Sequence, residues 1–410
     1  MNFGPDAEYT ELTSVLLYKP GPAISDHPAP SAVRHIAPIN HEELAGQLTD
    51  SLKRSPRNTR NPGRSSLGRP RLHNRNPCKN GLMSAIVFFY SRHGASPIKS
   101  FTAIIVALSL FTPFAFAEST TRLVLLGTGT PQPDPDRSGP ATAVVVNGSA
   151  YLVDFGPGVV RRAAAATLDK GVAALDPVNI RTVFATHLHS DHTAGYPDLI
   201  LTPWTMGRQK PLEVYGPKGL KNMTDHILKA YAEDIAVRRD GMEKASPEGW
   251  KVNVHEIRAG VVYKDTNVTV TAFPTRHGDW EESYGYRFDT ADRSIVISGD
   301  TTPVQATIDA CKGCDILVHE AQTMKFINNP MRPNIQGYDI KAYVAKYHTT
   351  TEQLADLATK AKPGLLVLYH NPITLRPEKR PMASTPDDLL REVTSRYRGK
   401  VVVGRDLDIY

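Results

Sequence analysis

Several features that mark other classes of protein are scarce in this chain of 410 residues. It has only three cysteines, too few for the disulfide framework of a small secreted domain. No repeat of about 20–50 residues recurs, which excludes a solenoid or a propeller. The longest apolar run, 101–117, is interrupted by Pro113 and is short for a membrane-spanning helix. These absences leave a globular domain with an apolar core.

The second part of the chain has no surplus of basic residues. The formal net charge of +6 comes from residues 1–117, because Lys and Arg equal Asp and Glu in number over 118–410. Segment 51–80 carries nine Lys and Arg and no acid. Residues 1–82 have no sustained apolar periodicity and cannot offset the entropy of folding. We expect 1–82 to be a disordered or wrongly assigned extension, with a nucleic-acid-binding arm as the alternative.

Residues 83–117 have the layout of a secretory signal peptide. Arg92 and Lys99 precede the apolar stretch, and Ala115-Phe116-Ala117 forms a small-residue cleavage site. No basic flank follows, which favours cleavage over a membrane anchor. We therefore expect a periplasmic or secreted domain at 118–410, in contact with the membrane only during export. The sequence leaves open whether Cys311 and Cys314 pair, and whether the protein is a homodimer.

Short runs rich in Val, Ile and Leu alternate with helical patterns after residue 120. The predicted strands are 122–126, 142–146, 151–154, 181–186, 212–216, 268–273, 294–298, 315–319, 364–370 and 400–404. The predicted helices are 158–169, 219–234, 303–310, 350–361 and 386–396. Thr349 with Glu352 suggests a capping box, and Thr385-Pro386 suggests a helix start. Strands interleaved with helices predict a layered α/β fold.

The segment 184–195, "FATHLHSDHTAG", concentrates potential metal ligands. His187 and His189 follow a predicted strand and project to one side if the chain is extended, whereas Asp191 and His192 come as the chain turns toward a helix. Imidazole with carboxylate suits zinc or another first-row divalent ion. Further ligands must come from elsewhere, and His277, Asp300 and His370 each follow a predicted strand.

This ordered set resembles the metallo-β-lactamase superfamily, over nearly all of 121–410. The resemblance implies a four-layer αββα sandwich and two Zn²⁺ ions, with other first-row divalent metals as alternatives. It assigns one metal to His187, His189 and His277, with Asp300 bridging to the second. It assigns the second metal to the following residues: Asp191, His192 and His370. Histidine at position 189 favours hydrolytic zinc, and the bridging aspartate argues against antibiotic hydrolysis.

Further stretches resemble the ribonuclease Z branch of this superfamily. They are "LLGTGTPQPDPDRSGPAT", "VHEAQT" and "YHTTTEQLADLA". The resemblance places the first at the rim of the active site. It makes His348 the group that protonates or stabilises the leaving oxygen, with Glu320 orienting it, and makes Asp154 a support for the ligand loop. Asp191 would orient the attacking hydroxide held between the metals.

The spacing of the ligands argues against tRNA processing. Bacterial tRNA-processing members carry a long arm between the third metal histidine and the bridging aspartate, whereas His277 and Asp300 are only 23 positions apart. The balanced charge and the export signal agree. The sequence is most similar to exported arylsulfatase-type members. We therefore expect a hydrolase of a small-molecule ester, most simply an aryl sulfate, with nucleic acid an unlikely partner.

Two alternatives stay open at this point. One is a phosphodiesterase, including a ribonuclease Z-type endonuclease that processes tRNA 3′ ends. The other is a periplasmic metal-binding module without turnover, which would have no need of His348. Trp204, Trp280 and Tyr284 are candidates for an aromatic wall beside the metals, although aromatic residues more often lie in the core.

The export signal makes a testable prediction about the N-terminus. Protein isolated from its native host should begin at or near Glu118, because the cleavage site precedes that residue. N-terminal sequencing measures this directly. A chain that starts at Met1 would contradict the prediction and restore the basic segment 51–80 to the working protein.

Overall fold

The computed structural model describes residues 121–329 and 337–410. The predicted extension at 1–82 and the predicted signal peptide at 83–117 lie outside these residues. Among the helices that are described, none is both long and apolar enough to cross a membrane.

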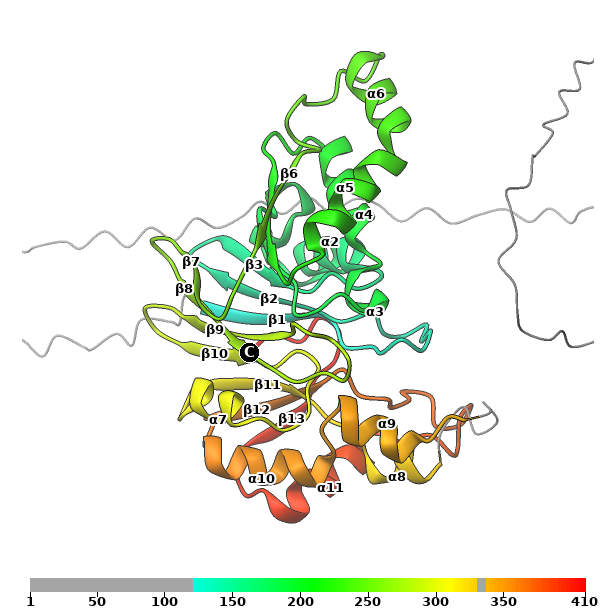
Figure 1. The fold of residues 1–410 in the computed structure, drawn as a ribbon, viewed down its shortest axis with the longest axis vertical. Coiled ribbons are helices and arrows are strands. Elements are labelled where there is room, and N and C mark those ends of the chain that lie inside the picture. The colour runs from blue at the N-terminus through cyan, green and yellow to red at the C-terminus, as the bar shows by residue number, and fades with distance from the viewer. Residues whose placement is uncertain (1–120, 330–336) are drawn as a thin grey trace, which may run out of the picture. The chain divides into compact units, whose positions relative to one another are not determined.

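Two β-sheets form the centre of the domain (Figure 1). The first sheet has the order β1-β2-β3-β4-β5-β6. Its strands are β1 (Thr121–Gly127), β2 (Ala141–Val146), β3 (Ser149–Val153), β4 (Thr182–Phe184), β5 (Leu212–Gly216) and β6 (Val252–Glu256). Its first three strands pair antiparallel, and β3 to β6 pair parallel.

The second sheet has the order β13-β12-β11-β10-β9-β8-β7. Its strands are β7 (Gly260–Lys264), β8 (Thr269–Pro274), β9 (Tyr284–Asp289), β10 (Ser294–Ile297), β11 (Ile316–Glu320), β12 (Leu365–Tyr369) and β13 (Val401–Val403). Strands β10 to β13 run parallel, and β7 to β10 pair antiparallel. Both sheets are therefore mixed.

Helices cover the outer face of each sheet. Those beside the first sheet are α2 (Val159–Lys170), α3 (Ser190–Thr193), α4 (Tyr196–Thr205), α5 (Leu220–Ala230) and α6 (Ala232–Asp240). Those beside the second are α7 (Gln305–Cys311), α8 (Met324–Asn328), α9 (Ile340–Tyr347), α10 (Thr351–Ala361) and α11 (Pro386–Arg396). Short 3₁₀ turns, η1 (Ala173–Leu175) and η2 (Pro177–Asn179), follow α2. The predicted αββα sandwich is confirmed.

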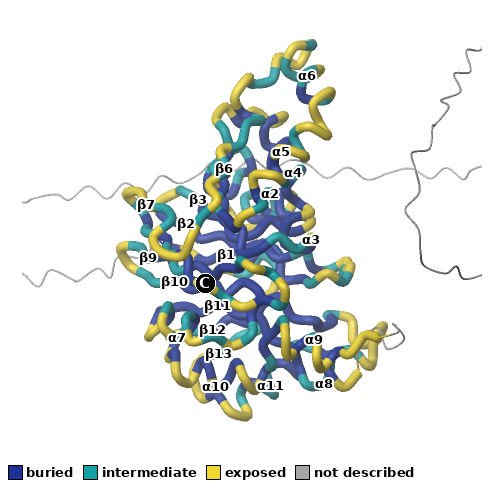
Figure 2. The backbone as a smooth tube through the Cα atoms, viewed as in Figure 1, coloured by how far each residue is buried: buried dark blue, intermediate teal, exposed yellow. Residues whose placement is uncertain are grey.

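Strand β1 has buried apolar side chains on both of its faces. Leu123 and Leu125 pack between the sheets with Phe184 and Phe288, whereas Val124 packs with the helices of the first sheet. All of these side chains are fully buried, as the dark blue strands in Figure 2 illustrate. Strands covered on both faces read as continuous Val/Leu runs, which is why the sequence pattern located most of them.

Several local expectations need correction. The capping box at the start of α10 is formed by Thr350 and Gln353, one position later than predicted, and Thr349 instead donates to the carbonyl oxygen of Thr301 (2.6 Å). Thr385 caps α11 as expected. The predicted strands and helices did not include β6, β7, β9, α4, α8 or α9. No residue of the edge strands β6 and β7 is buried, so they lack a continuous apolar signal.

The two cysteines near the end of α7 form a disulfide. Cys311 and Cys314 are both buried, against the cluster that α10 and α11 build on the second sheet. The bridge closes the short turn between α7 and β11. A separate hydrogen bond, from the N–H of Gly364 to the carbonyl oxygen of Cys314 (2.8 Å), links this turn to the residue before β12.

Candidate metal centre

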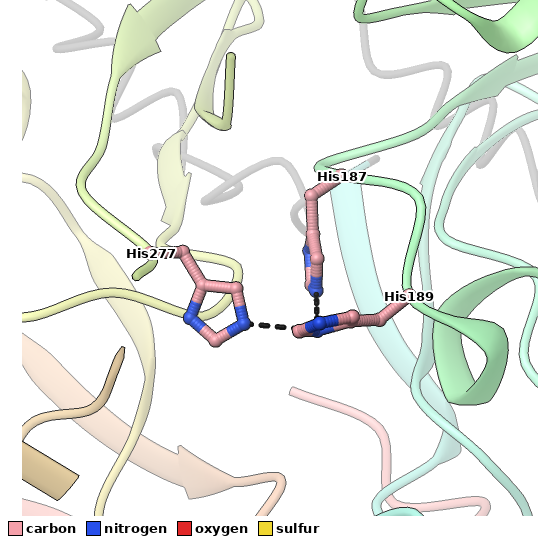
Figure 3. A group of neighbouring side chains, drawn as sticks. All are labelled: His187, His189 and His277. Atoms are coloured by element: carbon pink, nitrogen blue, oxygen red, sulfur yellow. Dashed lines mark hydrogen bonds between the residues drawn. The ribbon is translucent and has the colours of Figure 1, made fainter. Parts of the chain in front are cut away.

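Three imidazoles converge at the mouth of the sandwich, where strands of the two sheets end. His187 and His189 follow β4 in the first sheet, and His277 follows β8 in the second. Nδ1 of His189 lies 3.0 Å from Nε2 of His187 and 3.0 Å from Nε2 of His277 (Figure 3). Tetrahedral Zn²⁺ with bonds of about 2.0–2.1 Å needs nitrogens about 3.3 Å apart. The three nitrogen atoms fit such an ion.

A second group lies beside the first. Asp191 and His192 are in α3, and Oδ2 of Asp191 is 3.6 Å from Nε2 of both His192 and His370. Asp300 lies between the two groups: its Oδ1 is 3.4 Å from His192 Nε2, and its Oδ2 is 3.0 Å from His370 Nε2 and 3.9 Å from His277 Nε2. Asp300 is therefore placed to bridge two ions.

Three buried atoms of this centre lack a hydrogen-bond partner among the described residues. They are Oδ2 of Asp191, Oδ1 of Asp300 and Nε2 of His192. Burying polar or charged atoms without a partner is costly, unless an ion takes the partner's place. All three are ligand atoms of the type that divalent metals bind, so the residues present fit a two-metal centre.

The ligand rings are held from behind by hydrogen bonds. Nδ1 of His277 donates to the carbonyl oxygen of Tyr347 (2.7 Å), and Nδ1 of His370 donates to that of Gly129 (2.6 Å). Each bond places the ring proton away from the centre and leaves Nε2 free to bind a metal. Gly129 belongs to the glycine loop that the sequence placed at the rim.

Asp154 supports the ligand loop, in the position that the resemblance assigned to it. This residue follows β3 and has a positive φ of 62°. Its carboxylate accepts from Thr186 N (2.8 Å), Thr186 Oγ1 (3.0 Å) and His192 Nδ1 (2.8 Å). The buried carboxylate thus orients both the start of the ligand segment and one of its imidazoles.

The electrostatics differ between the two groups. Burial lowers the pKa of His187 well below its usual value and that of His189 to about 4, so these rings are neutral and ready to bind a cation. Burial also opposes protonation of His192 and His370, but the neighbouring carboxylates, Asp300 first among them, together outweigh it and raise both pKa values. The same negative charge favours a metal cation there.

His348 and Glu320 lie beside the metal ligands. Nδ1 of His348 is 2.9 Å from both carboxylate oxygens of Glu320, which also accepts from Thr301 N (2.8 Å). Nδ1 of His348 lies 4.0 Å from Asp300 Oδ2, and its Nε2 lies 3.2 Å from the hydroxyl of Tyr343. Burial alone would lower the pKa of His348, but Glu320 raises it above the usual value.

A cavity of about 260 Å³ opens onto the metal ligands. Its lining includes, among others, the following: Thr130, Gln132, His189, Asp191, Asp300, Gln322, Phe326, Tyr338, Tyr343, His348 and His370. The aromatic residues that line it, all on or next to α8 and α9, were missed by the sequence analysis. For Tyr343 a signal existed in the proximity of "AYVAKY" to His348 in the sequence.

Two of the three candidates for an aromatic wall lie in the core, where aromatic residues more often lie. Trp204 is buried in the helix-covered core of the first sheet and donates to Ser246 O (2.8 Å), and Tyr284 packs between the sheets. Only Trp280 reaches the centre, with Nε1 2.9 Å from His189 Nε2. Sequence spacing could not separate core aromatics from exposed ones, because both follow strands and helices in similar patterns.

The two-sheet sandwich thus carries imidazole and carboxylate groups at its strand ends that could hold metal ions of the kind used in metal-dependent hydrolases. Residues 150–371 match the family model described as a Beta-lactamase superfamily domain, and the chain belongs to this superfamily.

Relatives and solved structures agree with this assignment. The chain is 38% identical over 252 residues to a protein named Ribonuclease Z from Mycobacterium sp. (strain KMS), covering 60% of this chain and 83% of the relative. It is 32% identical over 293 residues to Ribonuclease Z of Mycobacterium bovis (strain BCG / Pasteur 1173P2), covering 70% and 96%. The short form of human tRNase Z has a TM-score of 0.51 at 22% identity, covering 70% and 98%, and so shows the fold.

These relatives correct the predicted partners. The expectation of a small-molecule ester substrate, with nucleic acid unlikely, is wrong, because the relatives are named as ribonucleases. The missing arm does not separate this chain from them. An alignment of 293 residues that spans 96% of the M. bovis protein leaves no room for a long additional arm there either. The predicted arylsulfatase activity finds no support in these comparisons.

The bridging position of Asp300 makes a testable prediction. Purified protein should contain about two metal equivalents, and Asp300→Ala should reduce this to about one or less, because it removes the oxygens shared by both groups. Metal analysis of the folded variant checks this. His226→Ala is the matched control, since His226 is an exposed histidine of α5 away from the centre. Two equivalents retained in Asp300→Ala would contradict the bridging role.

Proposed function

We propose that this protein uses two zinc ions to hydrolyse phosphodiester bonds in RNA, as a ribonuclease Z-type enzyme acting on 3′-extended tRNA precursors. The observation that carries this proposal is the similarity to proteins named Ribonuclease Z across 83–96% of their length. The complete set of strand-end ligands and the His348–Glu320 pair support catalysis rather than metal storage.

The donor set favours zinc. Five imidazoles and two carboxylates, with no cysteine in the cluster, suit a borderline divalent ion in a hydrolytic site. Zinc ions, when bound, act as Lewis acids on the phosphoryl oxygen and allow water to become a nucleophile near neutral pH. Asp191 lines the cavity beside the metal ligands, and we assign to it the orientation of the attacking water and the acceptance of its proton.

We assign to His348 a role at the leaving group, whereas Asp191 acts at the attacking water. Glu320 accepts the hydrogen bond from Nδ1, so Nε2 is the nitrogen that faces the cavity residue Tyr343. The raised pKa favours the protonated ring, which can donate from Nε2 to the leaving oxygen of the cleaved ester. Glu320 stabilises the positive ring and fixes its orientation. The arrangement matches a general acid beside a metal centre.

The proposal predicts a substrate preference. The metal-loaded protein should cleave a 3′-extended precursor tRNA in preference to nitrophenyl sulfate, because the relatives named after their activity are ribonucleases. Chelation should abolish cleavage and added Zn²⁺ should restore it. Gel analysis of the RNA products and release of nitrophenol measure the two reactions. Hydrolysis of the sulfate without cleavage of the RNA would contradict the proposal.

The general-acid role predicts a second outcome. His348→Ala should lower kcat by about 10²–10⁴-fold, while metal content stays near that of the parent protein. A leaving group that needs no protonation, such as a nitrophenolate in a phosphodiester, should suffer a smaller loss. The comparison of the two substrates separates a loss of acid catalysis from a loss of folding or metal binding, which would lower activity on both substrates. Equal losses on both substrates, or loss of metal in proportion to activity, would contradict this role.

A further inference from the structure

The cavity that holds the metal ligands also has an aromatic wall. We use this name for Phe326 of α8, Tyr338 before α9 and Tyr343 of α9, all of which line the cavity. The metal ligands that line it come from other segments, after β4, β10 and β12. One cavity therefore joins a charged, metal-binding side to a flat, aromatic side.

Tyr343 is held in place without a ligand. Its ring stacks on Tyr347, with centroids 4.9 Å apart and an interplanar angle of 20°, and it lies 5.8 Å from the ring of Tyr338. Its hydroxyl lies 3.2 Å from Nε2 of His348. A ring fixed in this way presents a prepared surface, so that binding a ligand there costs little side-chain entropy.

The rest of the lining indicates the chemistry of the occupant. Pro131, Ile340 and Pro372 extend the apolar surface, whereas Thr130 and Gln132 add neutral hydrogen-bonding groups. Among the described residues, no Lys or Arg lines the cavity, and the side chains next to the wall are apolar or neutral. A volume of about 260 Å³ suits a single small unit rather than a duplex.

We propose that the aromatic wall binds the base of the nucleotide next to the scissile phosphate. This inference rests on the proposed RNA substrate. A base is flat and uncharged, and bases splayed out of single-stranded RNA stack on aromatic side chains. With its phosphate at the metal ligands, one nucleotide would extend from the charged side of the cavity to the wall. Stacking would fix the position of the phosphate relative to His348, because Tyr343 would contact the base and its hydroxyl lies 3.2 Å from Nε2 of His348.

A binding experiment tests the wall directly. Calorimetry on the metal-loaded full chain compares adenosine 5′-monophosphate with ribose 5-phosphate, which has the same phosphate and sugar but no base. The nucleotide should bind roughly 5- to 150-fold more tightly, the range expected for one stacked base. Equal affinities would overturn the inference.

Substitutions of the wall residues test which side chains bind the base. Tyr343→Leu and Phe326→Leu should each reduce the affinity ratio, whereas Tyr343→Phe should keep most of it because the ring remains. Tyr231→Leu is the matched control, because Tyr231 is an exposed tyrosine at the junction of α5 and α6, away from the cavity. Metal content and Tm show whether each variant is folded. A ratio unchanged in folded Tyr343→Leu and Phe326→Leu would overturn the inference.

A cleavage experiment separates this inference from the proposed function. The substrate is a 3′-extended RNA with an abasic ribose beside the scissile phosphate. Slower cleavage of the abasic RNA by the parent protein, with the difference lost in Tyr343→Leu, would support the inference. Equal rates on abasic and intact RNA would overturn it and leave the proposed function standing. A Tyr343-dependent preference for the nucleotide without RNA cleavage would support the base site and reject the RNA substrate.

Discussion

The rest of the site depends on the burial of Asp300 between two groups of histidines. This carboxylate is 3% exposed, and one of its oxygens has no hydrogen-bond partner among the described residues. A buried charge of this kind is tolerated only beside positive charge, which a bound metal pair would supply. Its neighbours come from both sheets, so the stability of the centre requires that the two sheets meet with these strand ends facing each other.

Hydrogen bonds around the metal centre hold the glycine loop and the segment after His370 in position. Asp406, near the C-terminus, accepts from the backbone N–H of Thr128 (2.9 Å) and of Ser138 (2.8 Å), which closes the glycine loop. The buried Arg137 donates to the carbonyl oxygens of Asn371 (2.9 Å) and Ile373 (2.7 Å), in the segment that follows His370. The loop that holds His370 through Gly129 is thus tied to the chain that follows this ligand.

His348 connects the metal centre to the aromatic residues of the cavity. It lies near Asp300 on one side and contacts Tyr343 on the other, while Glu320 holds it from behind. Metal ligands, an ionisable ring and an aromatic side chain therefore lie within one small volume. The balanced charge of 118–410 gave no indication of this, because net charge describes solubility and long-range attraction rather than the lining of a cavity.

The ligand chemistry and the fold class were determined by the sequence alone. The cluster from His187 to His192 is local, and apolar strand runs with interleaved helices reflect short-range periodicity, so both can be read without coordinates. Only the tertiary structure decided which aromatic side chains face the cavity: Tyr343 and Phe326 do, whereas Trp204 and Tyr284 lie in the core. It also revealed the long-range bonds of Asp406 and Arg137. The physical reason is that these contacts join residues far apart in sequence, and only packing of the two sheets sets their distances and their exposure to the cavity.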